Sequence, residues 1–98
     1  MYLKIHNAGM GRTVVALCDK ELIGKKLVQD NLEINVTERF YKGEEVSEEE
    51  VVKVLKEAAN INLLGKKTVD IAVKAGIISE ENVLMIQGVP HANAQASS

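Results

Sequence analysis

The sequence is poor in the residues that mark several classes of protein. It contains one cysteine, one proline, no tryptophan and 3% aromatic residues in 98 positions. The single cysteine, Cys18, excludes an intramolecular disulfide. No apolar run approaches the roughly 18 residues needed to cross a bilayer. The N-terminus lacks the basic head and apolar stretch of a signal peptide. We therefore expect a cytoplasmic protein with no membrane partner.

An excess of charge of one sign is also missing, because 12 basic and 14 acidic residues leave a net charge of −2. A chain with this balance has no global basic field to attract nucleic acid. The charge is nevertheless unevenly distributed. Residues 1–42 contain seven Lys and Arg against five acids, whereas residues 43–65 contain six Glu against two Lys. The first part of the chain can therefore carry a local basic face.

What is present is the composition of an ordinary globular protein, with 46% hydrophobic and 27% charged residues. A chain of this length corresponds to one domain. The scarcity of aromatic residues means that the core must consist of Val, Ile, Leu and Ala. We expect a single domain over residues 1–92. Residues 93–98 are small and polar, and we expect them to form a flexible tail.

Alternating and β-branched segments predict four strands. Residues 2–6 alternate between apolar and polar, and residues 12–18 are apolar on both faces, so the glycine-rich turn between them predicts an antiparallel hairpin. Residues 83–87 are predicted to form a well-buried strand. A further strand over residues 32–36 should turn alternate side chains to the core, namely Leu32, Ile34 and Val36.

Two segments have the pattern of amphipathic helices. The first runs from Ser47 to about Ala59, and Ser47 with Glu50 three residues later forms a capping box. The second runs from about Gly65 to Ala75, and the following Gly76 is suited to a left-handed C-cap.

The remaining segments are predicted to connect these elements. Residues 19–31 are expected to form one helical turn or an ordered loop, and residues 37–43 a connection. The whole pattern predicts an α+β fold in which an antiparallel or mixed sheet of about four strands has two main helices on one face.

Cys18 has two interpretations. As a nucleophile it would need a base, which His6 or His91 could supply if the fold brought them close. As a buried residue it would be a small apolar side chain, which is the commoner state of free cysteine. One cysteine and two histidines without paired spacing do not make a zinc site, so no metal or cofactor is expected.

A cluster of aromatic and basic residues points to a second candidate site. Phe40 and Tyr41 stand between two cations, Arg39 and Lys42. Single-stranded RNA is bound by aromatic faces flanked by positive charge. The same aromatic residues could instead cover the edge of the core, and the sequence leaves both interpretations open.

Several motifs together resemble a known family. They are Cys18-Asp19-Lys20-Glu21-Leu22-Ile23-Gly24-Lys25, Phe40-Tyr41-Lys42-Gly43, Asn62-Leu63-Leu64-Gly65 and Gly88-Val89-Pro90-His91-Ala92. Over nearly the whole chain, the sequence resembles a family of small conserved archaeal proteins known only as a domain of unknown function. The resemblance implies an archaeal protein and brings no activity, cofactor or substrate. It singles out a set of binding residues: Cys18, Asp19, Glu21, Lys25 and His91.

These binding residues would meet if the strand at 83–87 runs parallel to the strand at 12–18. Both motifs would then lie at one edge of the sheet, and Asp19, Glu21 and Lys25 would form a polar rim around His91. A carboxylate near His91 would raise the imidazole pKa. Such a site would suit recognition of a polar or anionic group.

The leading functional hypothesis is a non-enzymatic binding or adaptor protein, associated with RNA or translation. One alternative is a small enzyme or small-ligand-binding protein that uses Cys18 and His91. The other is a homodimeric protein-interaction module.

Overall fold

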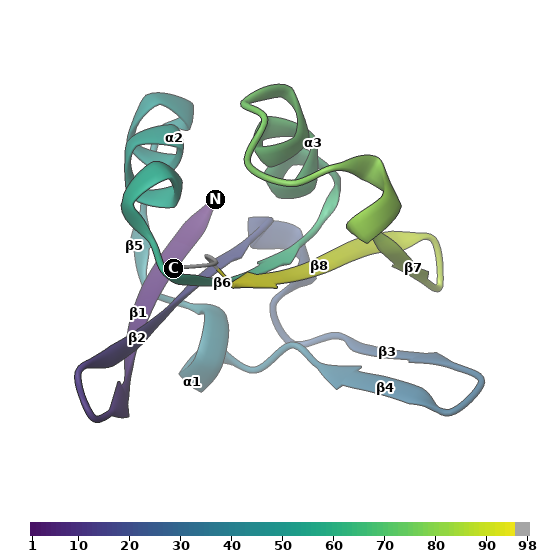
Figure 1. Cartoon of the computed structure of the whole chain (residues 1–98). Coiled ribbons are helices and arrows are strands. Elements are labelled where there is room, and N and C mark those ends of the chain that lie inside the picture. Colours follow the sequence, from purple (N-terminus) through teal and green to yellow (C-terminus); the bar gives the residue numbers. More distant parts are fainter. Residues whose placement is uncertain (96–98) are drawn as a thin grey trace.

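The structure is a computed structural model that describes residues 1–95, and it has an α+β fold. Six strands form a mixed sheet in the order β5-β1-β2-β6-β8-β7, and β3 and β4 form a separate hairpin (Figure 1). The sheet strands are β1 (Tyr2–Gly9), β2 (Arg12–Cys18), β5 (Glu44–Glu45), β6 (Asn60–Leu64), β7 (Leu84–Ile86) and β8 (Val89–Gln95). The separate hairpin consists of β3 (Lys26–Gln29) and β4 (Leu32–Asn35). The helices are α1 (Glu38–Tyr41), α2 (Glu48–Glu57) and α3 (Lys66–Lys74), with 3-10 turns at Lys20–Leu22 and Glu80–Asn82.

The sheet separates two layers (Figure 1). Helices α2 and α3 cover one face, here called the helix face, and α1 and the β3–β4 hairpin lie against the other, here called the hairpin face. Apolar clusters fill both sides. The cluster on the helix face contains Leu17, Leu55, Leu63, Val69 and Ala92. The cluster on the hairpin face contains Ala16, Cys18, Leu64, Tyr41 and Ile86.

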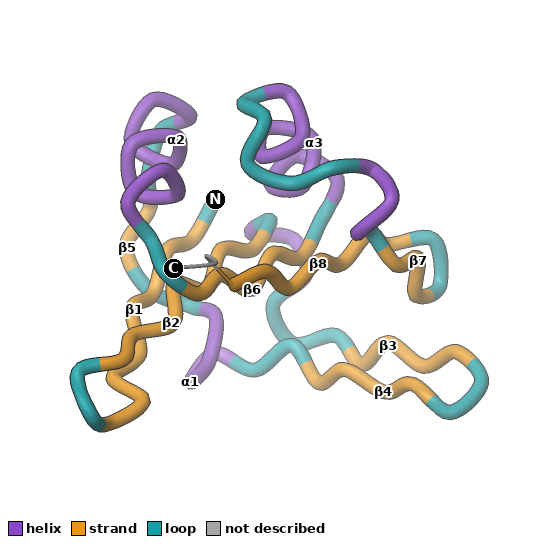
Figure 2. The backbone as a smooth tube through the Cα atoms, viewed as in Figure 1, coloured by secondary structure: helices purple, strands orange, loops and turns teal. Residues whose placement is uncertain are grey.

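The relative directions of the strands decide which chain segments meet at the same end of the sheet. β2 and β6 are parallel, and the other neighbouring strands of the sheet are antiparallel. Because β7 is antiparallel to β8, and β8 is antiparallel to β6, β7 runs parallel to β2. This relation agrees with the orientation on which the shared-site hypothesis depended. Figure 2 traces the long connection from β2 to β6 through the hairpin, α1 and α2.

The two main helices confirm the predicted signals. Ser47 Oγ accepts a hydrogen bond from the Glu50 N–H, and the Glu50 carboxylate accepts one from the Ser47 N–H, so the capping box is complete. Gly76 follows α3 with φ +73°, which suits a left-handed C-cap. The predicted 2–18 hairpin is also present as β1 and β2.

The prediction of about four strands and two helices is incomplete. The described residues contain six strands in the main sheet, two in the hairpin, and a short helix α1 in the segment predicted as a connection. Strand β6 was missed because Asn60 and Asn62 place polar side chains in the middle of a sheet. Residues 93–95 belong to β8, and the rest of the predicted tail, residues 96–98, lies outside the described residues.

Two predictions of burial are wrong. Leu84 and Met85 in β7 are 56% and 50% exposed, because β7 is a three-residue strand at the edge of the sheet. Leu32 is 46% exposed next to the turn of the β3–β4 hairpin, whereas Val36 is buried as predicted. The structure therefore exposes apolar side chains around β7 and the separate hairpin.

Candidate functional site

Asp19 lies at the N-terminus of α3, on the helix face. Its carboxylate accepts hydrogen bonds from the Lys67 N–H at 3.0 Å and the Thr68 N–H at 2.9 Å. The Thr68 hydroxyl also donates to it at 2.7 Å. Asp19 is 4% exposed and Thr68 is fully buried. Asp19 therefore caps a helix that begins 47 positions later in the sequence.

The residue at the N-cap of α3 is Gly65, which has no side chain to serve as a cap. A Cβ atom at Gly65 would lie 2.3 Å from Asp19 Cγ, so a side chain there is incompatible with this cap. The backbone N–H of Asp19 donates to Leu64 O, and the N–H of Gly65 donates to Pro90 O. These bonds bring three of the motifs singled out by the sequence together at one end of the sheet.

Cys18 and His91 share a row of side chains on the hairpin face. Cys18 is the register partner of Leu64, and Leu64 is the register partner of His91. Strand spacing places the Cα atoms of Cys18 and His91 about 10 Å apart, with Leu64 between them. Asp19 follows Cys18 in the chain and its side chain contacts α3 on the opposite face, so the Asp19 carboxylate and the His91 imidazole lie on different sides of the sheet.

The electrostatics of this row differ from those expected. Burial lowers the pKa of the His91 imidazole from its ordinary value. The expectation of an imidazole pKa raised by a carboxylate is therefore wrong. Burial first, and then the charges of Asp19 and Glu21, raise the pKa of the Cys18 thiol to about 12. A thiol with this pKa stays protonated near neutrality and is a poor nucleophile.

The other two residues of the motif are exposed. Glu21 lies in the 3-10 turn that follows Asp19, and Lys25 follows that turn. The Lys25 backbone accepts a hydrogen bond from the Val36 N–H at 2.8 Å and so joins the loop to the end of β4. Neither side chain has an ion pair among those found in the described residues.

A second candidate site lies where α1 meets β1. The rings of His6 and Phe40 stack with centroids 4.4 Å apart and an interplanar angle of 15°. His6 Nε2–H donates to Phe40 O at 2.7 Å, and the Lys4 ammonium contacts Arg39 O. These contacts hold α1 against the edge of the sheet. A surface hollow of about 350 Å³ is lined by Lys4, His6, Thr37, Arg39 and Phe40.

The four residues predicted to contact RNA are placed differently from one another. Phe40 is half-buried, and Arg39 and Lys42 are exposed. Tyr41 is 3% exposed, its hydroxyl donates to Asn62 Oδ1 at 2.8 Å, and burial raises its pKa to about 12. Tyr41 therefore packs in the core, in line with the structural interpretation of the cluster, while Phe40 is only half-buried and Arg39 is exposed.

Beside this stack, four carboxamide side chains form what we call the amide face. Asn60 is the register partner of Gln95, and Asn62 is the register partner of Asn93. Since alternate residues of a strand point to the same side, all four lie on the hairpin face. They surround a hollow of about 560 Å³ together with Val14. Val14 is the register partner of His6, so the hollow and the aromatic stack adjoin across the sheet.

Sequence reasoning missed the amide face. Its signal was the alternation of Asn60 and Asn62 with Ile61 and Leu63, which is typical of a strand with one apolar side. The opposite side of such a strand presents polar groups. The segment 93–95 repeats this pattern, but we expected a frayed tail there.

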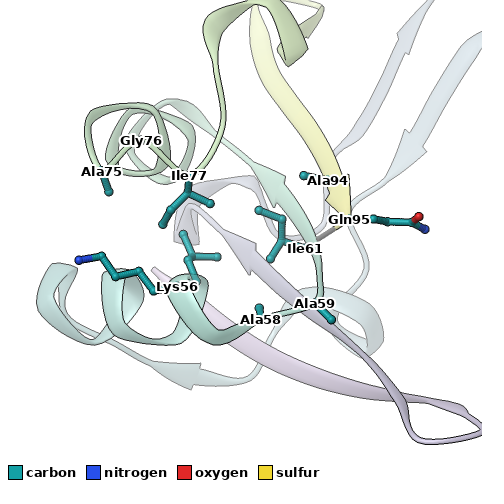
Figure 3. Close-up of a pocket in the computed structure, with 10 residues that line it drawn as sticks. Lys56, Ala58, Ala59, Ile61, Ala75, Gly76, Ile77, Ala94 and Gln95 are labelled. Carbon is teal, nitrogen blue, oxygen red and sulfur yellow. The ribbon is translucent and has the colours of Figure 1, made fainter. Parts of the chain in front are cut away.

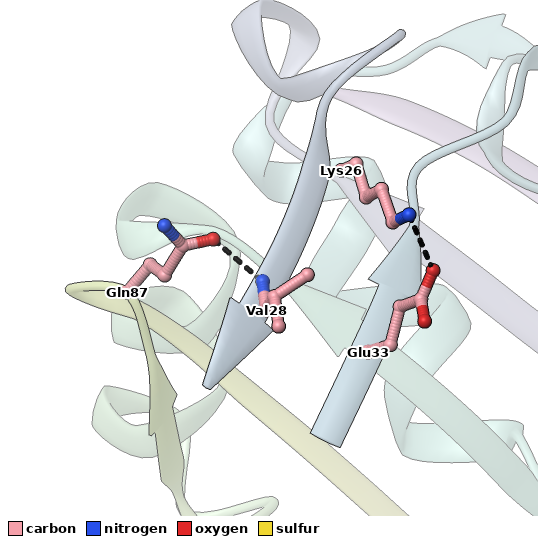
Figure 4. Close-up of polar contacts among 4 residues, drawn as sticks. All are labelled: Lys26, Val28, Glu33 and Gln87. Atoms are coloured by element: carbon pink, nitrogen blue, oxygen red, sulfur yellow. Dashed lines mark hydrogen bonds and ion pairs between the residues drawn. The ribbon is translucent and has the colours of Figure 1, made fainter. Parts of the chain in front are cut away.

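Two further features lie elsewhere on the molecule: a hollow between α2 and α3, and hydrogen bonds between Gln87 and the β3–β4 hairpin. A hollow of about 330 Å³ lies between the C-terminal ends of α2 and α3, with Ile61, Ile77 and Ala94 among the residues that line it (Figure 3). At the other end of the sheet, Gln87 Oε1 accepts a hydrogen bond from the Val28 N–H (Figure 4). The Gln87 N–H donates to Gln29 Oε1, so two hydrogen bonds connect the β3–β4 hairpin to the turn between β7 and β8.

Two classes of feature are missing from residues 1–95. No three His, Cys, Asp or Glu side chains gather there as ligands for a metal ion. None of the helices in this part of the chain has the length and apolar character that crossing a bilayer requires.

Comparison with known proteins places the chain in a family. The sequence profile described as "Protein of unknown function (DUF424)" matches residues 6–95, and the chain therefore belongs to this family. The fold is similar to the crystal structure of an uncharacterized conserved protein from Methanopyrus kandleri, with a TM-score of 0.78 and 27% sequence identity. The similarity covers 99% of this chain and 93% of that one. No curated protein matches the sequence.

Proposed function

We propose that this member of the family is a non-enzymatic protein that binds single-stranded RNA on the hairpin face of its sheet. The observation that carries the proposal is the stacked pair His6 and Phe40, which lines one surface hollow and lies beside Val14 of a second. Aromatic rings at the surface of a sheet provide stacking platforms for unpaired bases.

The charges around the stack favour a polyanionic ligand. Lys4 and Arg39 line the first hollow together with His6 and Phe40, and that hollow contains no acidic residue among the described ones. The ammonium and guanidinium groups can neutralise phosphates on either side of a stacked base. The protein as a whole is acidic, so this attraction is local and the affinity for long duplexes should be low.

The enzymatic alternative has less support. The Cys18 thiol is fully buried, its pKa is raised to about 12, and Leu64 separates it from His91. Nucleophilic catalysis requires a thiolate within reach of a base. The arrangement of Cys18 and His91 favours a role in packing the hairpin face.

Fluorescence anisotropy with a labelled ten-nucleotide single strand of mixed sequence tests the proposal. The wild type should bind at low salt, and the affinity should fall as salt is added. Phe40→Ala should weaken binding about 5- to 150-fold, since one base stacked on an aromatic ring is worth about 1–3 kcal/mol. Phe40→Leu keeps an apolar side chain without an aromatic face and should weaken binding as well, which separates lost stacking from lost packing.

Charge reversal provides the matched control. Arg39→Glu should weaken binding, whereas Lys53→Glu makes the same change of charge on α2, across the sheet from the stack, and should leave it nearly unchanged. Equal losses in these two variants would show that binding is non-specific. A wild type without measurable affinity at low salt would disprove the proposal.

A further inference from the structure

We infer that the amide face is a base-reading subsite that prefers adenine. The inference rests on the proposed function and deepens it, because it assigns the base recognised in the hollow beside the aromatic stack. The subsite consists of Asn60, Asn62, Asn93 and Gln95, with Val14 at its border.

The amides form a regular array. Asn60 and Gln95 face each other across β6 and β8, as do Asn62 and Asn93, so each pair has Cβ atoms roughly 5 Å apart. Successive side chains on one face of a strand are roughly 7 Å apart. The array therefore presents four carboxamides over an area comparable to that of one base. Val14 provides an apolar surface at its border.

Two of the amides are held in fixed orientations. The Asn60 Nδ2 group donates to Thr13 O at 3.1 Å, which leaves Asn60 Oδ1 to accept. Asn62 Oδ1 accepts from the Tyr41 hydroxyl at 2.8 Å, which leaves Asn62 Nδ2 to donate. The hollow thus contains one oriented acceptor and one oriented donor. Asn93 and Gln95 are exposed at its rim and can turn their amides toward a ligand.

Adenine matches this set of groups. A carboxamide places a donor and an acceptor side by side, and adenine presents an amino donor beside a ring-nitrogen acceptor on both of its open edges. Guanine presents two acceptors on its N7 edge, a pattern that Arg or Lys matches, and only its Watson–Crick edge places a donor beside an acceptor. None of the described residues that line the hollow is charged, so the hollow offers no Arg or Lys to pair with guanine. Adenine is a purine, and its two rings offer a larger stacking surface than the single ring of cytosine or uracil.

The aromatic stack and the amide face can act on one strand. His6 and Val14 are register partners on neighbouring strands, and Val14 borders the amide hollow. Asn60 lies one strand further, so strand spacing places the Cα atoms of His6 and Asn60 about 10 Å apart. A base on His6 and Phe40 would therefore leave an adjoining base over the amides.

A set of nine-nucleotide RNAs tests the inference. Each has four uridines on either side of one variable position, occupied by adenosine, guanosine, cytidine, uridine or purine riboside, which lacks the amino group of adenine. Binding to the full chain is measured by competition with a labelled strand. The strand with adenosine at the variable position should bind about 5- to 150-fold more tightly than the strands with purine riboside or guanosine, which is the range that one bidentate contact provides.

Variants separate this subsite from the rest of the surface. The variant that combines Asn93→Ala with Gln95→Ala should remove the preference for adenosine while binding of the all-uridine strand is retained. Asn35→Ala removes a carboxamide at an exposed strand position outside the hollow and should leave the preference intact. Asn62 is left unchanged because it also holds the buried Tyr41 hydroxyl.

The outcomes distinguish the two proposals. If all the strands bind with equal affinity, the base-reading subsite is disproved and RNA binding stands. If adenosine is preferred equally by the wild type and by the variant that combines Asn93→Ala with Gln95→Ala, the amide face does not recognise the base. If no strand binds at low salt, both proposals are disproved.

Discussion

The carboxylate of Asp19 accepts hydrogen bonds from both the N–H and the hydroxyl of Thr68, at 2.9 and 2.7 Å. A residue in the loop after β2 thereby completes the first turn of α3. The contact joins a motif from the first quarter of the chain to a helix in its second half. It gives Asp19 a role in the stability of the fold, which the family motif alone did not suggest.

Removal of this cap should destabilise the protein. Asp19→Ala leaves the buried Thr68 hydroxyl and N–H without their partner, and we expect a loss of about 2–4 kcal/mol in the free energy of unfolding. Urea unfolding followed by circular dichroism measures it. Glu21→Ala changes a nearby exposed acid and should stay within about 0.5 kcal/mol. Similar losses in both variants would contradict the assigned role of Asp19.

The close approach of Gly65 to Asp19 predicts a difference between two glycines. Gly65→Ala combines a positive φ of +114° with a Cβ 2.3 Å from Asp19 Cγ, and should cost about 2–5 kcal/mol. Gly76→Ala has a φ of +73° with no atom within 4 Å of the new Cβ, and should cost about 1–2 kcal/mol. Thermal unfolding of the two variants should therefore differ. Equal midpoints would show that Asp19 moves aside at no cost.

The capping box of α2 should be worth about 1 kcal/mol. Ser47→Ala removes the hydroxyl that accepts from the Glu50 N–H at 3.3 Å. Ser79 precedes a 3-10 turn without forming a side-chain cap, so Ser79→Ala should stay within about 0.5 kcal/mol. Chemical denaturation of both variants checks the pair. An unchanged midpoint for Ser47→Ala would mean that the exposed cap contributes nothing.

The helix-face core should respond strongly to truncation of α2. Leu55 is 2% exposed, so Leu55→Ala should lower the free energy of unfolding by about 2–5 kcal/mol. Leu84 is 56% exposed at the sheet edge, and Leu84→Ala should have an effect within about 0.5 kcal/mol. The same denaturation experiment compares the two leucines. A small loss for Leu55→Ala would contradict the packing of α2.

The buried thiol predicts a loss of stability in alkali. The pKa of Cys18 rises from 9.0 to about 12 on folding, so the folded protein retains a proton that the unfolded chain releases above about pH 9. Stability is therefore complete below pH 9 and falls as the pH rises toward 12. Cys18→Ala should flatten this fall in urea titrations between pH 8 and 10.5. Tyr41, whose pKa is also raised, should account for part of the remaining slope.

Alkylation tests the burial and protonation of the Cys18 thiol independently of stability. Iodoacetamide at pH 8 should react slowly with the native protein and rapidly after addition of urea, because burial and protonation both protect the thiol. Rapid reaction of the native protein would show that Cys18 is exposed or ionised.

Local sequence signals predicted several elements correctly. The capping box at Ser47, the glycine after α3 and the glycine turn between β1 and β2 depend on contacts within a few residues. The alternation of Leu3 and Ile5 with polar residues predicted strand β1 correctly, although Leu3 is buried and Ile5 is 58% exposed. Such signals specify an element without specifying what will cover it.

The candidate sites were predicted only in part. Phe40 and Arg39 lie at the surface hollow beside the sheet, but their neighbours His6 and Lys4 come from β1, more than 30 positions away. The amide face requires the pairing of β6 with β8, which no local pattern reveals. The polar rim predicted around His91 would need Asp19 on the hairpin face, but residues next to each other in a strand point to opposite faces, and the Asp19 carboxylate contacts α3.

By itself, the sequence determined the class of the fold, the ends of α2 and α3 and the first hairpin, because caps, turns and hydrophobic periodicity act over short distances. Only the tertiary structure decided that Asp19 caps α3, that Tyr41 is buried while Phe40 is half-buried, and that four carboxamides meet on one face. These outcomes depend on the parallel pairing of β2 with β6 and on the register of β6 with β8. A shift of one residue in either pairing would reverse every side chain of the strand.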